Sequence, residues 1–365
     1  MDLSAPHRVP LGWLMEHGSA SVRLRTMRDL APPGQPGLDI LEQAVLESKT
    51  VVGICKKQKD TGVWGGNLLG LAKSAKDGIK DIGTVAQYRR LHELGYPRDG
   101  RAHRLGDRIL FRYLSRDPDP KLMFEHAKTV KTSPLAEEWV RETMREAATA
   151  ALAEAGHGDD PRIRGSAHKI ASSVSQFLRS PLAENPFSRS GSSLILNPGA
   201  CPPTWYTLAM IAALPEIRRE RGGFTERLGQ YLSQVASRRT YSIVVGRKKI
   251  KPGHLLLGDP MAADAKGHAK DIPMALHFIE LMARIGAVGQ CAGAQRVLHR
   301  LYGDCDKGGV WRPRGIANAP KVFNPMSVHY WPLQPDSKTA EDRLVDVTFR
   351  LALIAVVMGR PIEYV

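Results

Sequence analysis

The sequence predicts an all-α protein built from paired helices, and two observations support this class. Apolar residues recur every three or four positions along most of the 365-residue chain, which is the spacing of an amphipathic helix. Short glycine- and proline-rich turns separate these segments, as expected for antiparallel helix pairs. Two similar glycine–tryptophan turns lie toward the two ends of the chain, at residues 59–66 and 306–311.

The first part of the chain predicts a helical leader and then a long helix. A leader at 1–35 contains a helix that Ser19 or Ser21 can cap and that ends at the Pro–Pro–Gly of residues 32–34. A longer helix begins at Leu38 and runs into the first tryptophan turn, because its apolar residues keep the helical spacing up to that point.

The next segments continue the pattern of paired helices. Residues 73–80 are predicted to be a charged, flexible connector. Helical spacing then appears at 83–94 and at 105–114, with a Gly–Tyr–Pro turn between the two segments. Two further helices are predicted, from about 136–155 and over 161–178.

The middle of the chain departs from this pattern twice. Residues 181–203 are rich in Ser, Pro, Gly and Asn and are predicted to be a long loop. Helical spacing returns over 205–235, and the period then changes, so that 240–257 is predicted to be a small β-hairpin inserted into the helical array. Asp271 begins another helix, which continues to Ile285.

The last predicted helix runs through Met358, and Thr339 with Asp342 resembles a capping box at its start. Neither the long loop nor the hairpin is long enough to mark a domain boundary. We therefore predict one domain over 1–365.

The first tryptophan turn has an unusual composition for the end of a helix. Gly62 can adopt the positive φ that ends a helix, and Trp64 can fold back as an apolar wedge whose N–H needs a partner. With Gln58, these residues resemble the QW repeat of squalene cyclases and of the terpenoid-cyclase and protein-prenyltransferase superfamily. In the second turn Cys305 occupies the place of the glutamine. The segment that opens the chain resembles the leader of bacterial members of uncertain role.

This resemblance implies an α/α toroid, a ring of helix pairs around a central cavity. It also implies an atypical terpenoid cyclase or prenyltransferase-like protein that binds an isoprenoid or another apolar ligand in that cavity. The Asp-x-Asp-Asp motif of squalene cyclases and the Asp-Asp-x-x-Asp motif of class I terpene synthases are absent. The activity therefore remains open at this point.

Asp304 and Asp306 come nearest to an acid motif and are the candidate catalytic residues; the alternative is that they only form a turn. Asp304, Cys305 and His329 are of the types that hold zinc in protein prenyltransferases, but their spacing differs from that family's. We predict no metal and no cofactor.

Aromatic residues near two predicted helix starts are the candidate substrate-binding residues. Aromatic walls suit an isoprenoid chain and can stabilise a carbocation by cation–π attraction. The alternative is that these side chains only pack in an ordinary core. The candidates are Trp205, Tyr206, His329, Tyr330 and Trp331.

The net charge of +15 favours acidic partners. Six basic residues lie in and just before the predicted hairpin, with no acidic residue among them. The alternative function is therefore a non-enzymatic protein that binds nucleic acid or an acidic protein partner through this basic face; a merely solvated face is the other interpretation. The six residues are Arg238, Arg239, Arg247, Lys248, Lys249 and Lys251.

Cysteine usage and apolar runs predict a cytoplasmic protein. The four cysteines include no CxxC pair, which favours reduced thiols. The N-terminus lacks the basic and apolar segments of a signal peptide. The longest apolar run, Leu351 to Met358, is too short to cross a bilayer.

Overall fold

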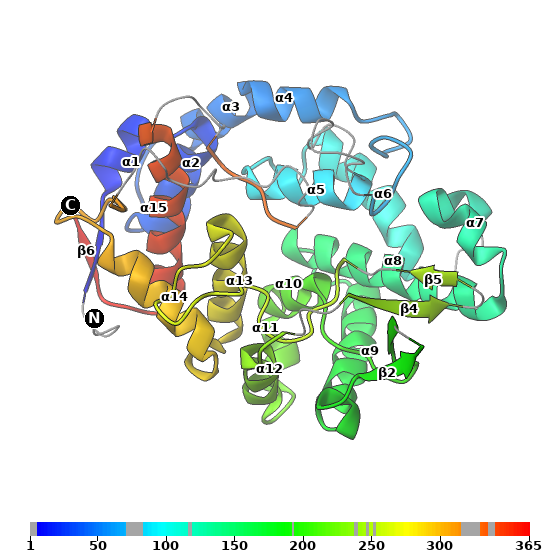
Figure 1. The fold of residues 1–365 in the computed structure, drawn as a ribbon. Helices are drawn as coiled ribbons and strands as arrows, with labels where there is room; N and C mark the ends of the chain where they lie inside the picture. Colours follow the sequence, from blue (N-terminus) through cyan, green and yellow to red (C-terminus); the bar gives the residue numbers. More distant parts are fainter. Residues whose placement is uncertain are drawn as a thin grey trace.

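The computed structural model describes residues 6–70, 83–115, 119–191, 193–236, 240–245, 248–250, 253–314, 329–334 and 340–365. The protein is mostly helical with small sheets (Figure 1). The helices are α1 (Leu11–His17), α2 (Ala20–Arg25), α3 (Leu38–Glu47), α4 (Lys49–Lys56), α5 (Thr84–Glu93), α6 (Arg101–Leu114), α7 (Ala127–Val130), α8 (Pro134–Glu154), α9 (Pro161–Leu178), α10 (Trp205–Ala213), α11 (Pro215–Arg219), α12 (Phe224–Ser233), α13 (Ile272–Ile285), α14 (Ala292–Gly303) and α15 (Ala340–Val357). The strands are β1 (His7–Val9), β2 (Phe187–Ser190), β3 (Ser193–Leu196), β4 (Tyr241–Val245), β5 (Lys248–Ile250) and β6 (Ile362–Tyr364).

Helices that are distant in sequence pack against one another in a closed order. We call α2, α5, α8, α10, α13 and α15 the inner circuit. From α5 to α15 each member packs on the next, and α15 packs on α2. The circuit closes between α2 and α5, where Arg25 Nη1 donates a hydrogen bond to the Glu93 carbonyl oxygen at 3.0 Å. α10 and α13 are buried around most of their circumference, as their nearly uniform apolar composition predicts.

The remaining long helices lie outside this circuit. α6 packs against both α5 and α8, and α9 packs against both α8 and α10. α3 buries only Val45, as expected of a helix with one narrow inward stripe. Figure 1 shows α3 and α4 along one outer edge of the molecule and α14 along another.

The two ends of the chain form a parallel strand pair that the sequence does not predict. β1 pairs with β6, so that His7 lies opposite Ile362 and Val9 lies opposite Tyr364. The termini accordingly lie close together in Figure 1. The expectation of an all-α protein is therefore wrong in this detail, because both three-residue strands are too short to produce a period-two signal.

The second sheet has the strand order β2-β3-β4-β5. β4 and β5 form the hairpin predicted within 240–257. β2 and β3 lie inside the segment 181–203, which was expected to be a loop, and β3 joins β4 in parallel. The Ser, Pro and Gly content concealed these strands, because the turn glycine Gly191 (φ +62°) lies within the segment.

The helix predicted from Leu38 is two helices. Ser48 has extended backbone angles (φ −63°, ψ 139°) and separates α3 from α4. Its Oγ accepts a hydrogen bond from the Val51 N–H at 3.4 Å, which caps α4. Serine offers the backbone this local alternative to a continuous helix, and an apolar spacing pattern does not detect it. The connector predicted at 73–80 and Thr339 of the predicted capping box lie outside the described residues.

The two tryptophan turns have the same backbone hydrogen bonds. Each tryptophan forms an isolated antiparallel bridge with the residue that opens its turn. The N–H of Trp64 donates to Thr84 Oγ1, and the N–H of Trp311 donates to Thr348 Oγ1, both at 3.1 Å. Both threonines belong to the inner circuit, so each turn connects the outside of the protein to an inner helix.

Each turn also contains a glycine that no other residue can replace without strain. Gly62 (φ +90°) and Gly309 (φ +82°) have left-handed backbone angles. A β carbon would lie 2.2 Å from the Leu105 carbonyl oxygen at Gly62 and 2.2 Å from the Arg8 carbonyl oxygen at Gly309. The first turn therefore packs closely against α6, and the second packs closely against β1.

The two turns differ in the partner of the indole. Trp64 Nε1 donates to the Ile54 carbonyl oxygen at 2.8 Å. In the second turn the thiol of Cys305 contacts the corresponding carbonyl oxygen, that of Leu301, at 3.7 Å. Trp311 Nε1 is buried and has no hydrogen-bond partner among the described residues.

This difference predicts unequal costs for the same substitution. Trp64→Phe removes a hydrogen bond and should lower the free energy of unfolding by about 1 kcal/mol more than Trp311→Phe does. Both indoles are 2% exposed, so the volume lost is the same. Denaturant unfolding of the two variants measures the difference, and equal losses would contradict the contribution of the Ile54 contact.

A candidate functional site inside the inner circuit

Arg350, on α15, is the centre of a buried network of charges. Its side chain is 4% exposed. Nη2 donates to Glu93 Oε1 at 3.0 Å, Nη1 to Glu280 Oε2 at 3.2 Å, and Nε to Asp346 Oδ2 at 3.2 Å. The three carboxylates belong to α5, α13 and α15. A buried guanidinium is tolerated when its nitrogens are paired in this way.

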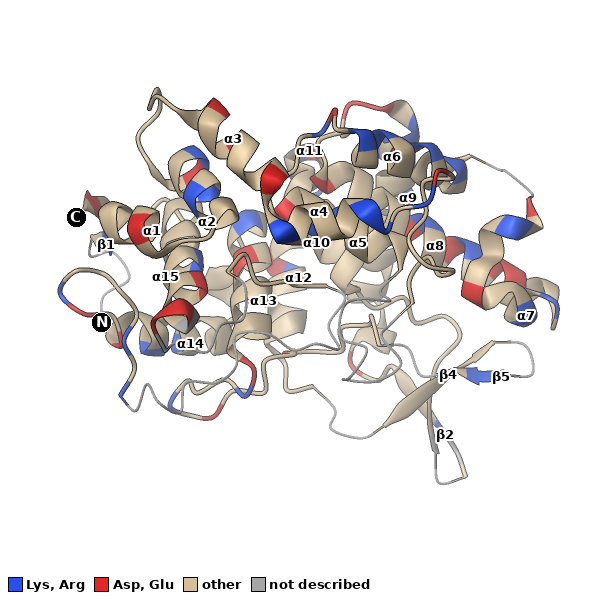
Figure 2. Ribbon diagram, turned by 90° about the horizontal axis from the view of Figure 1, so that it is seen from above, with Lys and Arg blue, Asp and Glu red and all other residues tan. Residues whose placement is uncertain are grey.

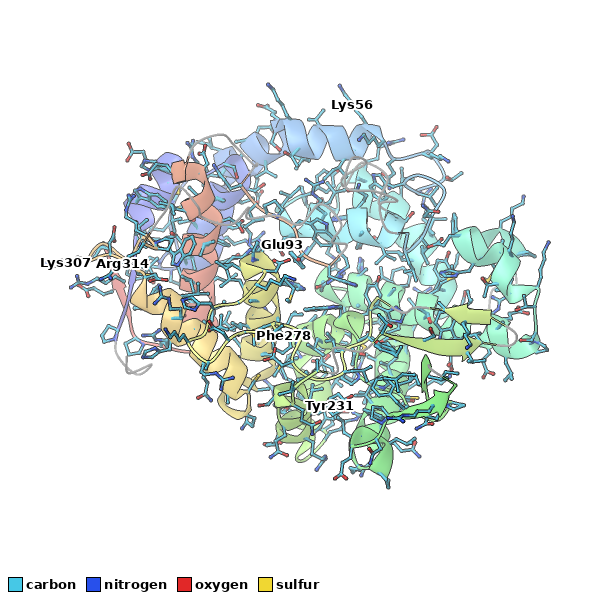
Figure 3. The ribbon with its side chains drawn as sticks, in the orientation of Figure 1. Lys56, Glu93, Tyr231, Phe278, Lys307 and Arg314 are labelled. Atoms are coloured by element: carbon cyan, nitrogen blue, oxygen red, sulfur yellow. The ribbon has the colours of Figure 1, made fainter. Side chains whose placement is uncertain are left out.

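Two further arginines extend the network to α2 and α8. Arg89, on α5, binds Glu154 of α8 through two bonds, Nε to Oε2 at 2.5 Å and Nη2 to Oε1 at 3.0 Å. Arg25, on α2, is paired with Asp29 and lies 3.4 Å from Glu93 Oε1. Arg25 thus joins the network through Glu93, whereas the Arg89–Glu154 pair lies beside it at the same cavity. Figure 3 shows Glu93 near the middle of the molecule.

These pairs keep Glu93 and Asp29 ionised. Burial alone would raise the pKa of Glu93, but Arg25 and Arg350 hold it well below its usual range. The pKa of Asp29 is also lowered, because the charges of Arg25 and Arg28 outweigh its burial. The interior is therefore charged at neutral pH, and it is not a hydrocarbon-lined cavity.

The structure brings the five candidate substrate-binding residues together beside this network. The rings of Trp205 and His329 stack at 5.7 Å, and the ring of Tyr206 meets His329 edge-on at 5.1 Å. The Arg89 guanidinium lies 5.6 Å from the Trp331 ring centre and 5.8 Å from the Tyr206 ring centre. These are cation–π distances.

Tyr330, the fifth candidate, is anchored at the start of α13. Its Oη donates to Asp271 Oδ2 at 2.8 Å, and its ring lies 5.9 Å from that of His277. All five candidates are buried, with at most 9% of each residue exposed.

The histidines in this region are neutral at pH 7. Burial, and then the charges of Arg89 and Arg350, lower the pKa of His277 to about 3. Burial lowers the pKa of His92 and of His254 to about 4. Neutral imidazoles have a lone pair, so they can accept a proton or a hydrogen bond.

A cavity of about 20 Å³ lies among these groups, which is room for roughly one water-sized atom group. Three buried nitrogens of its lining have no hydrogen-bond partner among the described residues: Arg89 Nη1, His277 Nε2 and Trp331 Nε1. The arginine and indole nitrogens can only donate. These two donors therefore lack an acceptor among the described residues, and an oxygen atom of a ligand would supply it. The lining consists of Arg89, His92, Glu93, Glu154, His277, His329, Tyr330, Trp331 and Arg350.

Residues 329–334 cross the interior and close this cavity (the orange trace near the middle of Figure 1). The Trp331 carbonyl oxygen accepts from Arg350 Nη2 at 2.8 Å. The Leu333 N–H donates to Asp346 Oδ1 at 2.8 Å, and Gln334 Oε1 accepts from the Ser19 N–H at 2.7 Å. The segment is thus held by α15 and by the start of α2.

The two candidate catalytic aspartates lie elsewhere, in the second tryptophan turn. Asp306 Oδ1 accepts from the N–H groups of Gly308 and Val310 at 2.9 and 3.0 Å. Asp304 forms an ion pair with Arg300 at 3.2 Å. In Figure 3, Lys307, which follows Asp306, lies at the outer edge of the molecule. These contacts are those of turn-forming residues, and the aspartates do not line the cavity.

The predicted basic face can be placed only in part. Arg238, Arg239, Arg247 and Lys251 lie outside the described residues. Lys248 and Lys249 belong to β5; Lys249 is exposed, and the side chain of Lys248 is not among those described. Binding by this hairpin stays a prediction.

The sequence analysis did not select the charged residues of the network. The sequence signal for some of them is a polar residue within a mainly apolar helix. Glu280 and His277 within α13 are of this kind, as are Asp346 and Arg350, one turn apart within α15. Charged residues at buried helix positions are rare unless they are paired. Their partners, however, lie on other helices.

Comparison with models of protein families, with curated proteins and with solved structures gave no match. In the described part of the chain, no cluster of three His, Cys, Asp or Glu side chains could hold a metal ion, and no helix has both the length and the apolar composition to cross a membrane. The functional argument therefore depends on the geometry of the interior.

The network predicts a large cost for removing its central arginine. Arg350→Met removes one partner from each of the carboxylates of Glu93, Glu280 and Asp346, of which the last two are buried, and should lower the free energy of unfolding by about 3–5 kcal/mol. Arg284→Met is the matched control, because Arg284 binds the same Glu280 from a side chain that is 37% exposed; its cost should be about 1 kcal/mol or less. Denaturant unfolding distinguishes them, and similar costs would refute the central role of Arg350.

The buried histidines predict that stability falls as the pH is lowered from about 6.5 to 4. An unfolded histidine takes up a proton near pH 6.5, whereas folded His277 does so only near pH 3. Stability is therefore complete above the unfolded pKa and is lost below it, by about 1.4 kcal/mol per pH unit for each such group. His277→Gln should reduce the slope of unfolding free energy against pH by about one proton in this window. An unchanged slope would show that His277 is not held neutral.

Proposed function

We propose that the chain is an α/α-toroid protein whose interior binds a small polar molecule and acts on it by proton transfer. The observation that carries this proposal is the lining of one small cavity by Arg89 Nη1, Trp331 Nε1 and His277 Nε2, none of which has a partner among the described residues. The toroid part is supported by the closed order of the inner circuit and by the repeated tryptophan turn.

The missing acceptor favours a polar ligand over an isoprenoid chain. A carbonyl or carboxylate oxygen can accept from both Arg89 and Trp331, whereas an apolar ligand would leave both donors buried and unpaired, which costs about 1–3 kcal/mol for each group. A site built for an oxygen therefore discriminates against hydrocarbon. The rings of Trp205 and Tyr206 can still pack against an apolar part of the ligand.

The same geometry supports a reaction next to a carbonyl group. Arg89 and Trp331 hold the carbonyl oxygen, and His277 takes the proton from the neighbouring carbon. The electron pair of the broken C–H bond moves to the oxygen, where the two donors stabilise the negative charge. That charge raises the affinity of His277 for the proton. Return of a proton to the same carbon completes a proton exchange, or an epimerisation if it arrives on the opposite face, without any oxidant.

The size of the cavity sets a condition on binding. It accommodates about one oxygen-sized group. The rest of the ligand must occupy space where residues 329–334 now close the interior, so these residues have to shift when the ligand binds. Their anchors include hydrogen bonds to the charged groups of Arg350, Asp346 and Asp271, which contribute about 1.5–3 kcal/mol each and which ligand binding has to offset.

The test uses 2-oxo acids and simple sugars as polar probes and farnesol as the apolar probe. The wild-type protein in D2O should incorporate deuterium next to the carbonyl of at least one polar probe, as measured by NMR. Trp331→Phe should weaken its binding about tenfold by removing one donor, and His277→Gln should abolish exchange while binding persists. Binding of farnesol, with neither binding nor exchange of the polar probes, would favour the isoprenoid hypothesis and refute this one.

A further inference from the structure

We propose that the outside of α4 and α6 is a binding surface for the phosphate backbone of a double-stranded nucleic acid. The surface, which we call the basic stripe, lies away from the cavity and away from the β4–β5 hairpin. It consists of Lys56, Lys57, Lys59, Arg101, Arg104 and Arg108.

The arginines of the basic stripe share one face of α6. Arg101, Arg104 and Arg108 are all exposed. Their spacing of three and four residues places them in a row about 10 Å long. Figure 2 shows this concentration of basic residues along α6. The one acidic residue of the helix, Asp107, is partly buried and accepts a hydrogen bond from Tyr88 Oη at 2.6 Å, so it lies off the exposed row and forms no ion pair with its arginines among the described residues.

The first tryptophan turn holds the lysines beside this row. Gln58 Nε2 donates to the Gly62 carbonyl oxygen within the turn at 3.1 Å and to the Ala102 carbonyl oxygen in the first turn of α6 at 2.9 Å. The backbone that carries Lys57 and Lys59 is therefore fixed against α6. Figure 3 shows Lys56 at the outer edge of the protein. Two basic segments that are distant in sequence thus form one surface.

Most charges of the basic stripe have no acidic partner among the residues that the structure describes. Asp60 pairs with Arg101 at 2.9 Å, but both side chains are largely exposed, so this pair is weak. The other five side chains form no ion pair among the described residues. An external polyanion can therefore bind them without first breaking internal contacts, and it releases counterions when it does so.

The chemistry of the stripe favours a duplex over the other polyanions. Single-stranded nucleic acid binds to surfaces on which its bases stack on aromatic side chains, and an anionic membrane binds best where apolar side chains insert beside the basic ones. The large exposed apolar residues of the described chain include none from α4 or α6. Contacts to phosphates alone fix a duplex without reading its sequence.

The experiment compares three variants with the same change of charge in binding to a 20-base-pair DNA duplex over a range of salt concentrations. The stripe variant is Lys57→Glu/Arg104→Glu/Arg108→Glu. The hairpin variant is Arg247→Glu/Lys248→Glu/Lys249→Glu. The control variant is Lys266→Glu/Lys270→Glu/Arg296→Glu, whose residues are exposed in the loop before α13 and on α14.

The wild-type protein should bind, with an affinity that falls steeply as salt rises. The stripe variant should lose at least tenfold in affinity, and the slope of log affinity against log salt concentration should become shallower by about three phosphate contacts. The control and hairpin variants should remain within about threefold of the wild type in affinity. Each variant's unfolding midpoint is measured, and Lys57→Gln/Arg104→Gln/Arg108→Gln repeats the test without introducing acidic groups.

Four outcomes would overturn the proposal. They are equal losses in all three variants, a loss confined to the hairpin variant, absence of duplex binding, and binding to phosphatidylserine vesicles or to single strands that exceeds binding to the duplex.

Discussion

The guanidinium of Arg350 is the group on which the interior depends most. It binds carboxylates of α5, α13 and α15 and the carbonyl oxygen of Trp331, so it joins opposite sides of the inner circuit. A purely apolar interface tolerates small rotations of a helix, whereas a buried charge tolerates no loss of its partner. We infer that this network sets the rotation of each inner helix, and that the aromatic cluster takes its position from it.

The interior and the exterior of the protein use different kinds of connection. Inside, arginine–carboxylate pairs join helices that are far apart in the sequence. Outside, the tryptophan turns join helices that are neighbours in sequence, through Trp64 and Gln58 in the first turn. In the second turn β1 occupies the position that α6 has beside the first, and Arg8 Nη1 donates to the Lys307 carbonyl oxygen at 2.7 Å. The same turn thus accepts either a helix or a strand as its neighbour.

Much of the helical structure could be predicted from the sequence, because apolar spacing reports directly which face of a helix is buried. The helices at 161–178 and at the C-terminus illustrate this, since α9 and α15 lie where they were expected. The break at Ser48 and the strands β1 and β6 could not be predicted in this way. Each depends on a local hydrogen bond or on pairing between distant segments, to which periodicity is insensitive.

The candidate site, like the fold, has residues that could be predicted from the sequence and residues that could not. The aromatic candidates Trp205 and His329 could be selected by residue type, and the structure places them in contact. Arg89 could not be selected, because it is one of several polar residues of α5, and His277 stands out within its apolar helix but has no assignable role until its neighbours are known. The unpaired nitrogens cannot be recognised from the sequence at all, since only the three-dimensional structure shows that they have no hydrogen-bond partner among the described residues.

The pairing of β1 with β6 has a consequence for synthesis of the chain. Arg8 and Glu363, which bond at 2.9 Å, are separated by 355 positions, so this contact cannot form until residue 363 has been synthesised. Until then α2 has no α15 to pack against, and its buried face remains open to other hydrophobic surfaces. Pairing of β1 with β6, which has a very large sequence separation, should therefore be among the last and slowest events of folding.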